Sequence, residues 1–196
     1  MIRVSVPVVL ASASATRREL LGRLVGEFEV VPPAIDEGSF EACGPSELAL
    51  KLAEAKAADV AARRPDALVI AADTLVVCEG KIIGKPCDAA DAERILALLS
   101  RHPHTVLTAV AVATPQGRRR SFCAEARVTM KPLSRRQIKA LAAEGDVMDK
   151  AGAYSLTPDD PRLRGLEGSI ATVMGLPLDE LAALMAELYP QDKGDA

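Results

Sequence analysis

The hydrophobic pattern of the chain predicts strands and helices in a mixed order. Residues 4–11 form a mostly apolar run that predicts a strand, and residues 16–25 carry leucines at helical spacing. The apolar run over 67–86 predicts two strands around a tight turn, and residues 104–130 predict a long hairpin that turns near 115–117. The remaining predicted elements are a short strand within 27–33 and helices over 45–64, 88–101, 133–144 and 178–188.

The order of these elements combines strand–helix units with hairpins, so we expect an α/β fold on a mixed sheet. At 196 residues the chain fits one hydrophobic core, with two lobes at most. We expect residues 1–190 to form a single domain and residues 191–196 to be a disordered tail. Residues 151–168 contain glycines and prolines and predict a loop. Ser46 is the expected N-cap of the second long helix.

Composition and charge narrow the classes of ligand. Hydrophobic residues make up 49% of the chain, aromatic residues make up 3%, and Trp is absent. This composition disfavours a nucleic-acid binder that stacks bases on aromatic side chains. The formal net charge is −3, so an anionic ligand has to be met by a local cluster of cations and not by a basic face.

The cysteines and histidines do not predict a metal centre. The four cysteines are widely spaced and include no Cys-x-x-Cys pair, and His102 and His104 flank a proline in a predicted turn. No apolar run approaches the roughly 20 residues that a membrane span requires, and the apolar start is too short for a signal peptide. We therefore expect a cytoplasmic protein with no membrane partner.

The segment LASASATRRELL places Ser12, Ser14 and two arginines where a strand turns into a helix. Cations are disfavoured there because they meet the positive end of the helix dipole. Arg17 shares its face with three leucines and points inward, whereas Arg18 lies about 100° round the helix. Hydroxyls and free N–H groups at a helix start suit a phosphate. Simple capping by Ser14 or Thr16, and an arginine that snorkels to solvent, are the alternatives.

Lys56 lies within the apolar arc of the helix predicted over 45–64, because it falls at four-residue spacing within a series of apolar residues. A buried ammonium needs a partner or a lowered pKa, which makes Lys56 a candidate site residue. The alternative is a pair within the helix, with Asp59 or near Glu54.

Asp73 is the residue that indicates a functional site most strongly. Every residue from 67 to 77 except Asp73 and Thr74 is apolar, which is typical of a strand covered on both faces. A carboxylate in such a strand costs stability unless it meets a cation, a metal ion or hydrogen-bond donors. The alternative is an exposed turn between two short strands.

Two loop segments complete the candidate set. Lys85 precedes a proline and is therefore held extended directly after a strand, and Asp36 and Glu37 form an acidic pair ahead of the long helix. Cations that hold phosphates, carboxylates that hold Mg²⁺ and one base that activates water are what the hydrolysis of a polyphosphate requires. The sequence therefore indicates a phosphate chain as the ligand.

The order of several motifs resembles the Maf family of nucleoside triphosphate pyrophosphatases, and the match covers nearly the whole chain. These motifs are LASASATRRELL, AIDE, LAEAKA, AADTLVV, GKIIGKP, HTVLTAVAV, DKAGAY and GSIATVMGLPL. The resemblance implies a mixed twisted β-sheet flanked by helices, with two lobes and a cleft between them, as in inosine triphosphatase-like proteins. It also implies cleavage between the α and β phosphates, with a divalent cation, Mg²⁺ or Mn²⁺, as cofactor.

The resemblance assigns roles by position. Asp73 matches the general base of the family, and Glu37 matches the residue that holds the metal with it. Matches to the positions that contact phosphate or metal also include Ser12, Arg17, Lys56 and Lys85, to which we add Ser14 from the helix-start argument. Family members are cytoplasmic homodimers that are thought to clear unwanted nucleotides, with a link to septum formation.

Three threonines stand at positions that distinguish the branches of the family. The branch acting on dTTP and UTP has Arg, Thr and Gln where this chain has Thr16, Thr74 and Thr157, and the branch acting on 7-methyl-GTP has Trp, Gln and Glu. Only Thr74 matches one of the two branches, the one acting on dTTP and UTP. It favours dTTP and UTP, with a preference broadened toward other nucleotides. A 7-methyl-GTP pyrophosphatase and a non-catalytic nucleotide-binding regulator of division are the alternatives.

Overall fold

The computed structural model describes residues 2, 4–144 and 147–189, so the predicted tail over 191–196 lies outside the described residues. The strands are β1 (Val8–Ala11), β2 (Glu29–Val30), β3 (Leu68–Cys78), β4 (Lys81–Ile83), β5 (His104–Ala113), β6 (Arg119–Met130) and β7 (Leu163–Glu167). The helices are α1 (Ala15–Leu24), α2 (Pro45–Arg63), α3 (Ala89–Leu99), α4 (Arg135–Ala142), α5 (Ile170–Val173) and α6 (Leu178–Leu188), with short 3₁₀ turns η1 (Glu37–Ser39), η2 (Val147–Asp149) and η3 (Ala151–Ala153).

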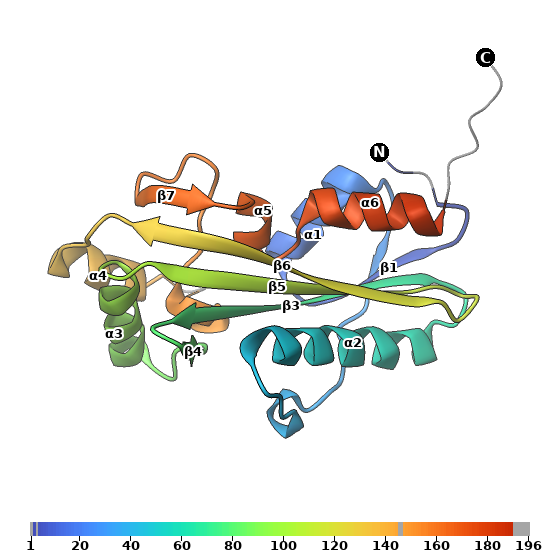
Figure 1. Ribbon diagram of the computed structural model, residues 1–196, viewed down its shortest axis with the longest axis horizontal. Coiled ribbons are helices and arrows are strands. Elements are labelled where there is room, and N and C mark those ends of the chain that lie inside the picture. The colour runs from blue at the N-terminus through green and yellow to red at the C-terminus, as the bar shows by residue number, and fades with distance from the viewer. Residues whose placement is uncertain (1, 3, 145–146, 190–196) are drawn as a thin grey trace, which may run out of the picture. The chain divides into compact units, whose positions relative to one another are not determined.

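The chain divides into two compact units. The first comprises residues 1–73, 109–124 and 175–196, and the second comprises residues 74–108 and 125–174. Hydrogen bonds join the strands in the order β2, β1, β3, β5, β6, β7, and β4 pairs with β3. Parallel and antiparallel pairs both occur, which confirms the predicted α/β fold on a mixed sheet flanked by helices (Figure 1).

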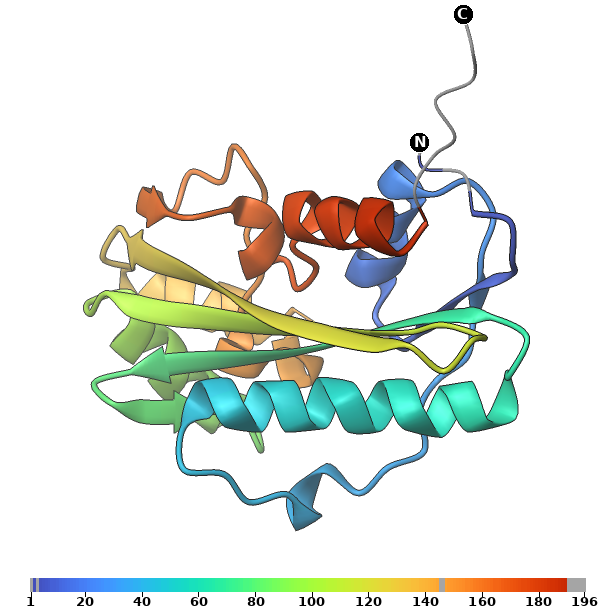
Figure 2. The ribbon, with the colours of Figure 1, turned by 45° about the vertical axis from the view of Figure 1, so that its right-hand side comes forward.

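The first unit is built around parallel strands. β1 pairs in parallel with β2 and with the first part of β3, in the register that places Leu10 beside Ile70. Helix α2 covers one face of these strands, and α1 and α6 lie together on the other (Figures 1 and 2). Cover on both faces explains why β1 and the first part of β3 are nearly continuous apolar runs.

Helix α2 begins one residue earlier than its predicted cap. Pro45 occupies the first turn, where a missing N–H costs nothing, and Gly44 is the N-cap without a side-chain hydrogen bond. The prediction of Ser46 as N-cap is therefore wrong. The buried face of α2 includes Leu52, Lys56 and Val60, as the four-residue spacing predicted.

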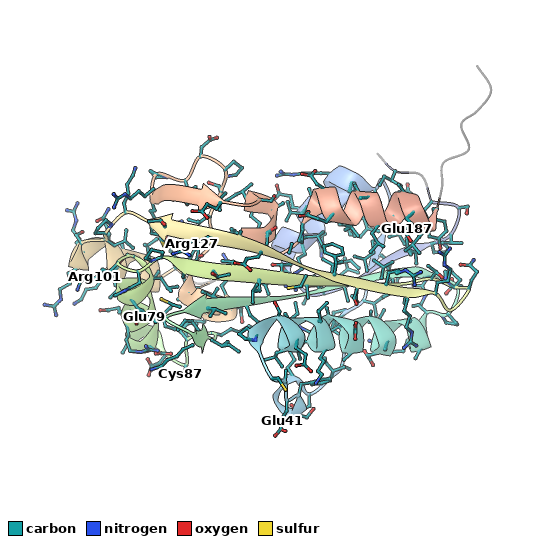
Figure 3. The ribbon with its side chains drawn as sticks, in the orientation of Figure 1. Glu41, Glu79, Cys87, Arg101, Arg127 and Glu187 are labelled. Atoms are coloured by element: carbon teal, nitrogen blue, oxygen red, sulfur yellow. The ribbon has the colours of Figure 1, made fainter. Side chains whose placement is uncertain are left out.

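The second unit contains the predicted hairpin between β3 and β4. These strands are antiparallel, and the turn residues Glu79 and Gly80 both have positive φ, at 50° and 76°. Two successive positive φ angles are typical of the type I′ turn that suits a two-residue hairpin. Figure 3 labels Glu79 at this turn and Cys87 ahead of α3, which packs against α4.

The segment over 151–168 contains more structure than the predicted loop. It includes η3 and strand β7, which pairs antiparallel with β6, and the short helix α5 follows it. Gly168 ends β7 with φ +94°, and a Cβ on this residue would lie 2.7 Å from the carbonyl oxygen of Glu125. This position therefore requires glycine, because both the backbone angle and the close approach exclude a side chain.

His104 is the first residue of β5 and is buried, whereas the sequence placed it in a turn. Its Nδ1 lies 3.3 Å from the carbonyl oxygen of His102, so Nδ1–H donates there and Nε2 accepts from the Tyr154 hydroxyl at 2.7 Å. Burial lowers the pKa of His104 below its ordinary value and raises the pKa of Tyr154. This histidine is therefore neutral and occupied by hydrogen bonds.

Candidate active site

Ser12 and Ser14 organise the connection from β1 to α1. Ser12 is buried directly after the last residue of β1, and its Oγ accepts from the backbone N–H of Ser14 at 3.2 Å. The Oγ of Ser14 accepts from the backbone N–H of Arg17 at 3.3 Å and caps the helix. The capping role is thus present, and it orients the serines at a helix start that favours anions.

Arg17 points inward, as its place among the leucines predicted. Its Nη1 donates to Ser12 Oγ at 3.3 Å and its Nε donates to the carbonyl oxygen of Gly175 at 2.9 Å. Burial lowers the pKa of the Arg17 guanidinium, and the carboxylates of Asp73 and Glu37 act in the opposite direction. Arg18 is exposed. The two neighbouring arginines therefore have different environments, and only Arg17 is held among the candidate residues.

The hydroxyl group of Ser12 has a defined hydrogen-bonding role. Its oxygen accepts from the Ser14 backbone and from Arg17 Nη1. A hydroxyl oxygen has two acceptor positions and one proton to donate. Toward any further partner, Ser12 can therefore act only as a donor. A phosphate oxygen is the kind of acceptor that such a buried donor suits.

Lys56 joins two carboxylates. Its Nζ lies 2.6 Å from Asp73 Oδ1 and 2.8 Å from Glu37 Oε1. The side chains of Lys56 and Asp73 are each 8% exposed, whereas that of Glu37 is 55% exposed. The ion pair between Lys56 and Asp73 is therefore buried, and Glu37 reaches it from the surface.

The alternative partners of Lys56 are occupied elsewhere. Asp59 pairs with Arg63 one turn along α2, and Glu54 accepts a hydrogen bond from Ser121. The prediction of a pair within the helix is therefore wrong for Lys56. Lys51 provides the contrast, because it does make such a pair with Glu47 and donates to the backbone oxygen of Glu41, which Figure 3 labels in the loop ahead of α2.

The loop before α2 presents Glu37 through contacts with its neighbours. Asp36 caps η1 by accepting from the backbone N–H of Gly38, and Asp59 on α2 accepts from the backbone N–H of Ala34. Of the acidic pair seen in the sequence, Asp36 is thus structural. Glu37 is the member that reaches Lys56.

Asp73 has one committed oxygen and one that lacks a partner. Oδ1 binds Lys56, whereas Oδ2 is buried and has no hydrogen-bond partner among the described residues. Asp73 lies in β3 and is 6% exposed, so the alternative of an exposed turn is wrong. A buried carboxylate oxygen without a partner is costly, by roughly 1–3 kcal/mol. Such an atom is suited to a water molecule, a metal ion or a substrate proton.

The residues present fit a divalent cation that is completed by its substrate. Within residues 2, 4–144 and 147–189, no group of three or more His, Cys, Asp or Glu side chains is arranged to hold a metal ion. Mg²⁺ often binds through one or two carboxylates together with water and substrate phosphates. Glu37 and Asp73, which contact the same ammonium, and the unpartnered Oδ2 meet that requirement.

The other predicted site residues occupy separate places in the fold. Thr16 is half-buried in the first turn of α1, which belongs to the first unit. Lys85, Thr74 and Thr157 belong to the second unit. Lys85 is exposed in the loop after β4, and Thr157 is exposed in a turn where its carbonyl accepts from the Asp160 backbone.

Thr74 belongs to a chain of hydrogen bonds that the sequence did not reveal. Its Oγ1 lies 3.0 Å from Thr108 Oγ1, and Thr108 donates to the carbonyl oxygen of Thr172 at 2.7 Å. Since Thr108 gives its only proton to that carbonyl, Thr74 must donate to Thr108. The hydroxyl proton of Thr74 is thus directed to Thr108. A threonine in an apolar strand carries no signal of such a role.

The charged loop after Tyr154 is occupied by its own contacts. Arg162 pairs with Asp160 at 2.6 Å and donates to the carbonyl oxygen of Ser155. Hydrogen bonds from Arg162 lower the pKa of Asp160, and those to Asp160 raise the pKa of Arg162. These charges therefore stabilise the loop conformation.

The chain is similar in sequence to known proteins over most of its length. The family described as Maf-like protein matches residues 7–188. A relative from Moorella thermoacetica, named dTTP/UTP pyrophosphatase, is 47% identical over 180 residues, which cover 91% of this chain and 93% of the relative. A relative of the same name from Geotalea uraniireducens is 44% identical and covers 89% and 91%.

Solved structures support the fold. The Ham1 protein of Staphylococcus aureus has a TM-score of 0.52 at 15% identity, covering 93% of this chain and 99% of that one. A HAM1 protein from Coxiella burnetii has a TM-score of 0.51 at 14% identity, with the same coverage. No helix among the described residues is long and apolar enough to cross a membrane. The family match and the high identity to its members establish that the chain belongs to the Maf family.

Proposed function

We propose that the protein hydrolyses nucleoside triphosphates between the α and β phosphates, releasing a nucleoside monophosphate and pyrophosphate. The observation that carries this proposal is the carboxylate of Asp73, which is buried, held at Oδ1 by Lys56 and without a described partner at Oδ2. General-base chemistry needs such an oriented acceptor within reach of a water molecule. The names of the relatives support the same reaction class.

In this reaction Asp73 Oδ2 accepts a proton from the attacking water. The water oxygen forms the new bond to phosphorus while the bridging P–O bond between the α and β phosphates breaks. Lys56 holds the other oxygen of the same carboxylate at 2.6 Å and so fixes its orientation. Preorganisation of this kind lowers the barrier, because no group has to be rearranged during the reaction.

The phosphates are bound at the start of α1. Ser12 donates its hydroxyl proton and Arg17 supplies the guanidinium, with the first N–H groups of the helix nearby. Ser14 caps the helix and keeps its start in shape. Lys85, which the family resemblance assigns to phosphate binding, belongs to the second unit. A local cluster of this kind is necessary, because the net charge of −3 does not attract an anion.

Glu37 and Asp73 would hold a divalent cation, Mg²⁺ or Mn²⁺, together with the phosphates. When bound, the cation neutralises the developing charge on the phosphate oxygens. Glu37 suits this role because its side chain is exposed and can rearrange, whereas Asp73 is fixed. We further propose a cytoplasmic homodimer without nucleic-acid or membrane partners, which clears unwanted nucleotides.

dTTP and UTP are the preferred substrates in this proposal. Relatives that are 40–47% identical carry the name dTTP/UTP pyrophosphatase, and Thr74 matches that branch. A threonine hydroxyl whose proton is directed to Thr108 suits the N3–H donor of thymine and uracil better than the N3 acceptor of cytosine. Thr16 and Thr157 are the other positions assigned to base recognition.

A substrate screen with detection of pyrophosphate tests the proposal. The purified protein is incubated with dTTP, UTP, CTP, GTP and 7-methyl-GTP, each with Mg²⁺ and with an excess of EDTA. We expect pyrophosphate from dTTP and UTP with Mg²⁺ and none with EDTA. Preference for 7-methyl-GTP would identify the other branch of the family. Nucleotide binding without release of pyrophosphate would identify a non-catalytic binder and overturn the proposal.

A further inference from the structure

One contact links the first turn of α1 to a distant part of the sequence. The Nε–H of Arg17 donates to the carbonyl oxygen of Gly175 at 2.9 Å, although the two residues are 158 positions apart. Both belong to the first unit. A second contact, from Nη1 to Ser12 Oγ, involves another nitrogen of the same guanidinium. Because the guanidinium is planar, two contacts through different nitrogens fix its orientation.

The direction of the Gly175 carbonyl depends on glycine. Gly175 follows Met174, the C-cap of α5, and has φ +97°. This angle is available to glycine and strained for residues with a Cβ. The next two residues fix the chain on the other side, because Leu176 is fully buried and Pro177 has φ −65°. A side chain at position 175 would therefore relax its strain by rotating the peptide that carries the carbonyl.

We propose that Gly175 is a positioning residue for substrate binding, acting through Arg17. The inference rests on the proposed function, in which Arg17 binds the phosphates of the nucleotide. Gly175 itself does not contact the substrate. Its carbonyl holds Nε of Arg17, so that the rest of the guanidinium is oriented before the nucleotide arrives. The long side chain of Arg17 then needs little further ordering when the nucleotide binds, so less affinity is lost to the entropy cost of ordering it.

A double-mutant cycle tests this dependence. Gly175→Ala is expected to lower kcat/KM for dTTP by about 10- to 100-fold, the range for one hydrogen bond to a charged group. In an Arg17→Ala background the same substitution should change kcat/KM by less than about 2-fold, because no guanidinium remains to be oriented. Equal losses in both backgrounds would show that Gly175 acts on the fold alone and would overturn the inference.

Gly117→Ala is the matched control for backbone strain. Gly117 has φ +79° in the exposed turn between β5 and β6, and a Cβ there would meet no atom within 4 Å. Both substitutions force a side chain onto a positive φ, so both are expected to lower the melting temperature. Only Gly175→Ala should lower kcat/KM. A similar loss in Gly117→Ala would also overturn the inference, since strain alone would then explain the effect.

Arg17→Lys provides a test that leaves Gly175 unchanged, in case Gly175→Ala does not fold. Lysine keeps the charge but lacks the planar fork that reaches Gly175 and Ser12 together. We expect its kcat/KM to lie close to that of Arg17→Ala. Wild-type values in Arg17→Lys would overturn the inference while leaving the proposed function intact. Absence of any pyrophosphatase activity in the wild-type protein would overturn both.

Discussion

Lys56 Nζ lies 2.6 Å from Asp73 Oδ1, and both side chains are almost fully buried. The pair connects α2 to the central strand β3 and leaves the second carboxylate oxygen facing no described partner. Lys56 thus fixes the orientation of the carboxylate through Oδ1, while Oδ2 of Asp73 stays available as a hydrogen-bond acceptor. This division of roles between two oxygens of one side chain is the basis of the first prediction.

Asp73→Asn is expected to lower kcat by at least about 100-fold, the scale for loss of a general base. The amide has nearly the same shape, and its oxygen can still accept from Lys56, so the variant should fold and bind the nucleotide, although its melting temperature should fall because Lys56 loses a charged partner. Steady-state kinetics and calorimetric titration with dTTP measure the two effects. Asp66→Asn is the control, because Asp66 is exposed and pairs with Arg64. Near-wild-type turnover of Asp73→Asn would remove this residue from the mechanism.

Arg17→Ala should reduce turnover far more than Arg18→Ala. Arg17 contacts Ser12 and Gly175, whereas Arg18 is exposed. The two substitutions remove the same charge from adjacent positions, so any difference in turnover reflects the different directions in which the two side chains point. Kinetics with dTTP measure the difference, and equal losses in the two variants would contradict the assignment of the phosphate site to Arg17.

Thr108→Val is expected to weaken the discrimination between dTTP and CTP. The wild-type protein should prefer dTTP in kcat/KM by roughly 10- to 200-fold, the range for weak pocket contacts. Without Thr108, the hydroxyl proton of Thr74 is no longer directed to that residue, and cytosine N3 becomes an acceptable partner. We expect the ratio to fall about 10-fold.

Thr108→Ser is the matched control for this substitution, because it retains the hydroxyl group. It should keep the wild-type ratio of dTTP to CTP. An unchanged ratio in Thr108→Val would mean that Thr74 does not read the base through its oxygen. A total loss of activity toward both nucleotides would instead point to a role in holding the strands together.

Mild acidification should destabilise the protein through His104. Burial keeps the folded-state pKa of this histidine below its ordinary value of 6.5. As the pH falls below 6.5, the unfolded chain therefore binds a proton that the folded chain excludes, and the free energy of unfolding decreases. The contribution is fully present above the ordinary pKa and is lost as the pH approaches the folded-state pKa.

Melting temperatures measured from pH about 7.5 to about 5.5 check this prediction. His104→Gln should lose less stability over that interval than the wild-type protein, although it is less stable at neutral pH. His102→Gln is the control, because the side chain of His102 is only half-buried, beside Glu79. An identical pH dependence in wild type and His104→Gln would assign the effect to other groups.

Residues that violate a local pattern were predictable from the sequence. Asp73 is a carboxylate in an apolar strand and Lys56 a cation on an apolar helix face, and each was expected to need a partner. Their pairing with each other could not be derived, because it depends on how α2 packs on β3. The contribution of Gly175 was hidden for the same reason, since a backbone carbonyl has no sequence signature and its partner is 158 residues away.

Three differences between the predicted and the observed secondary structure have local causes. Strand β7 was missed because its residues, LRGLE, are half-buried or exposed and do not alternate, and pairing with β6 alone defines it. The first strand begins at Val8, although the apolar pattern starts at Val4. The cap of α2 is Gly44 and not the predicted Ser46, because proline is favoured at the first helical position and Pro45 occupies it.

The pair of Lys56 and Asp73 also has an evolutionary consequence. Two buried charges and an unpartnered oxygen make the folded state less stable than a well-packed apolar pair of similar volume could, by about 1–4 kcal/mol. Loss of one charge alone is strongly destabilising, by roughly 3–5 kcal/mol, because it strands the other. A lineage released from selection for catalysis therefore has to cross an unstable single mutant before it reaches the more stable apolar pair. This barrier favours persistence of the two residues together in such a lineage.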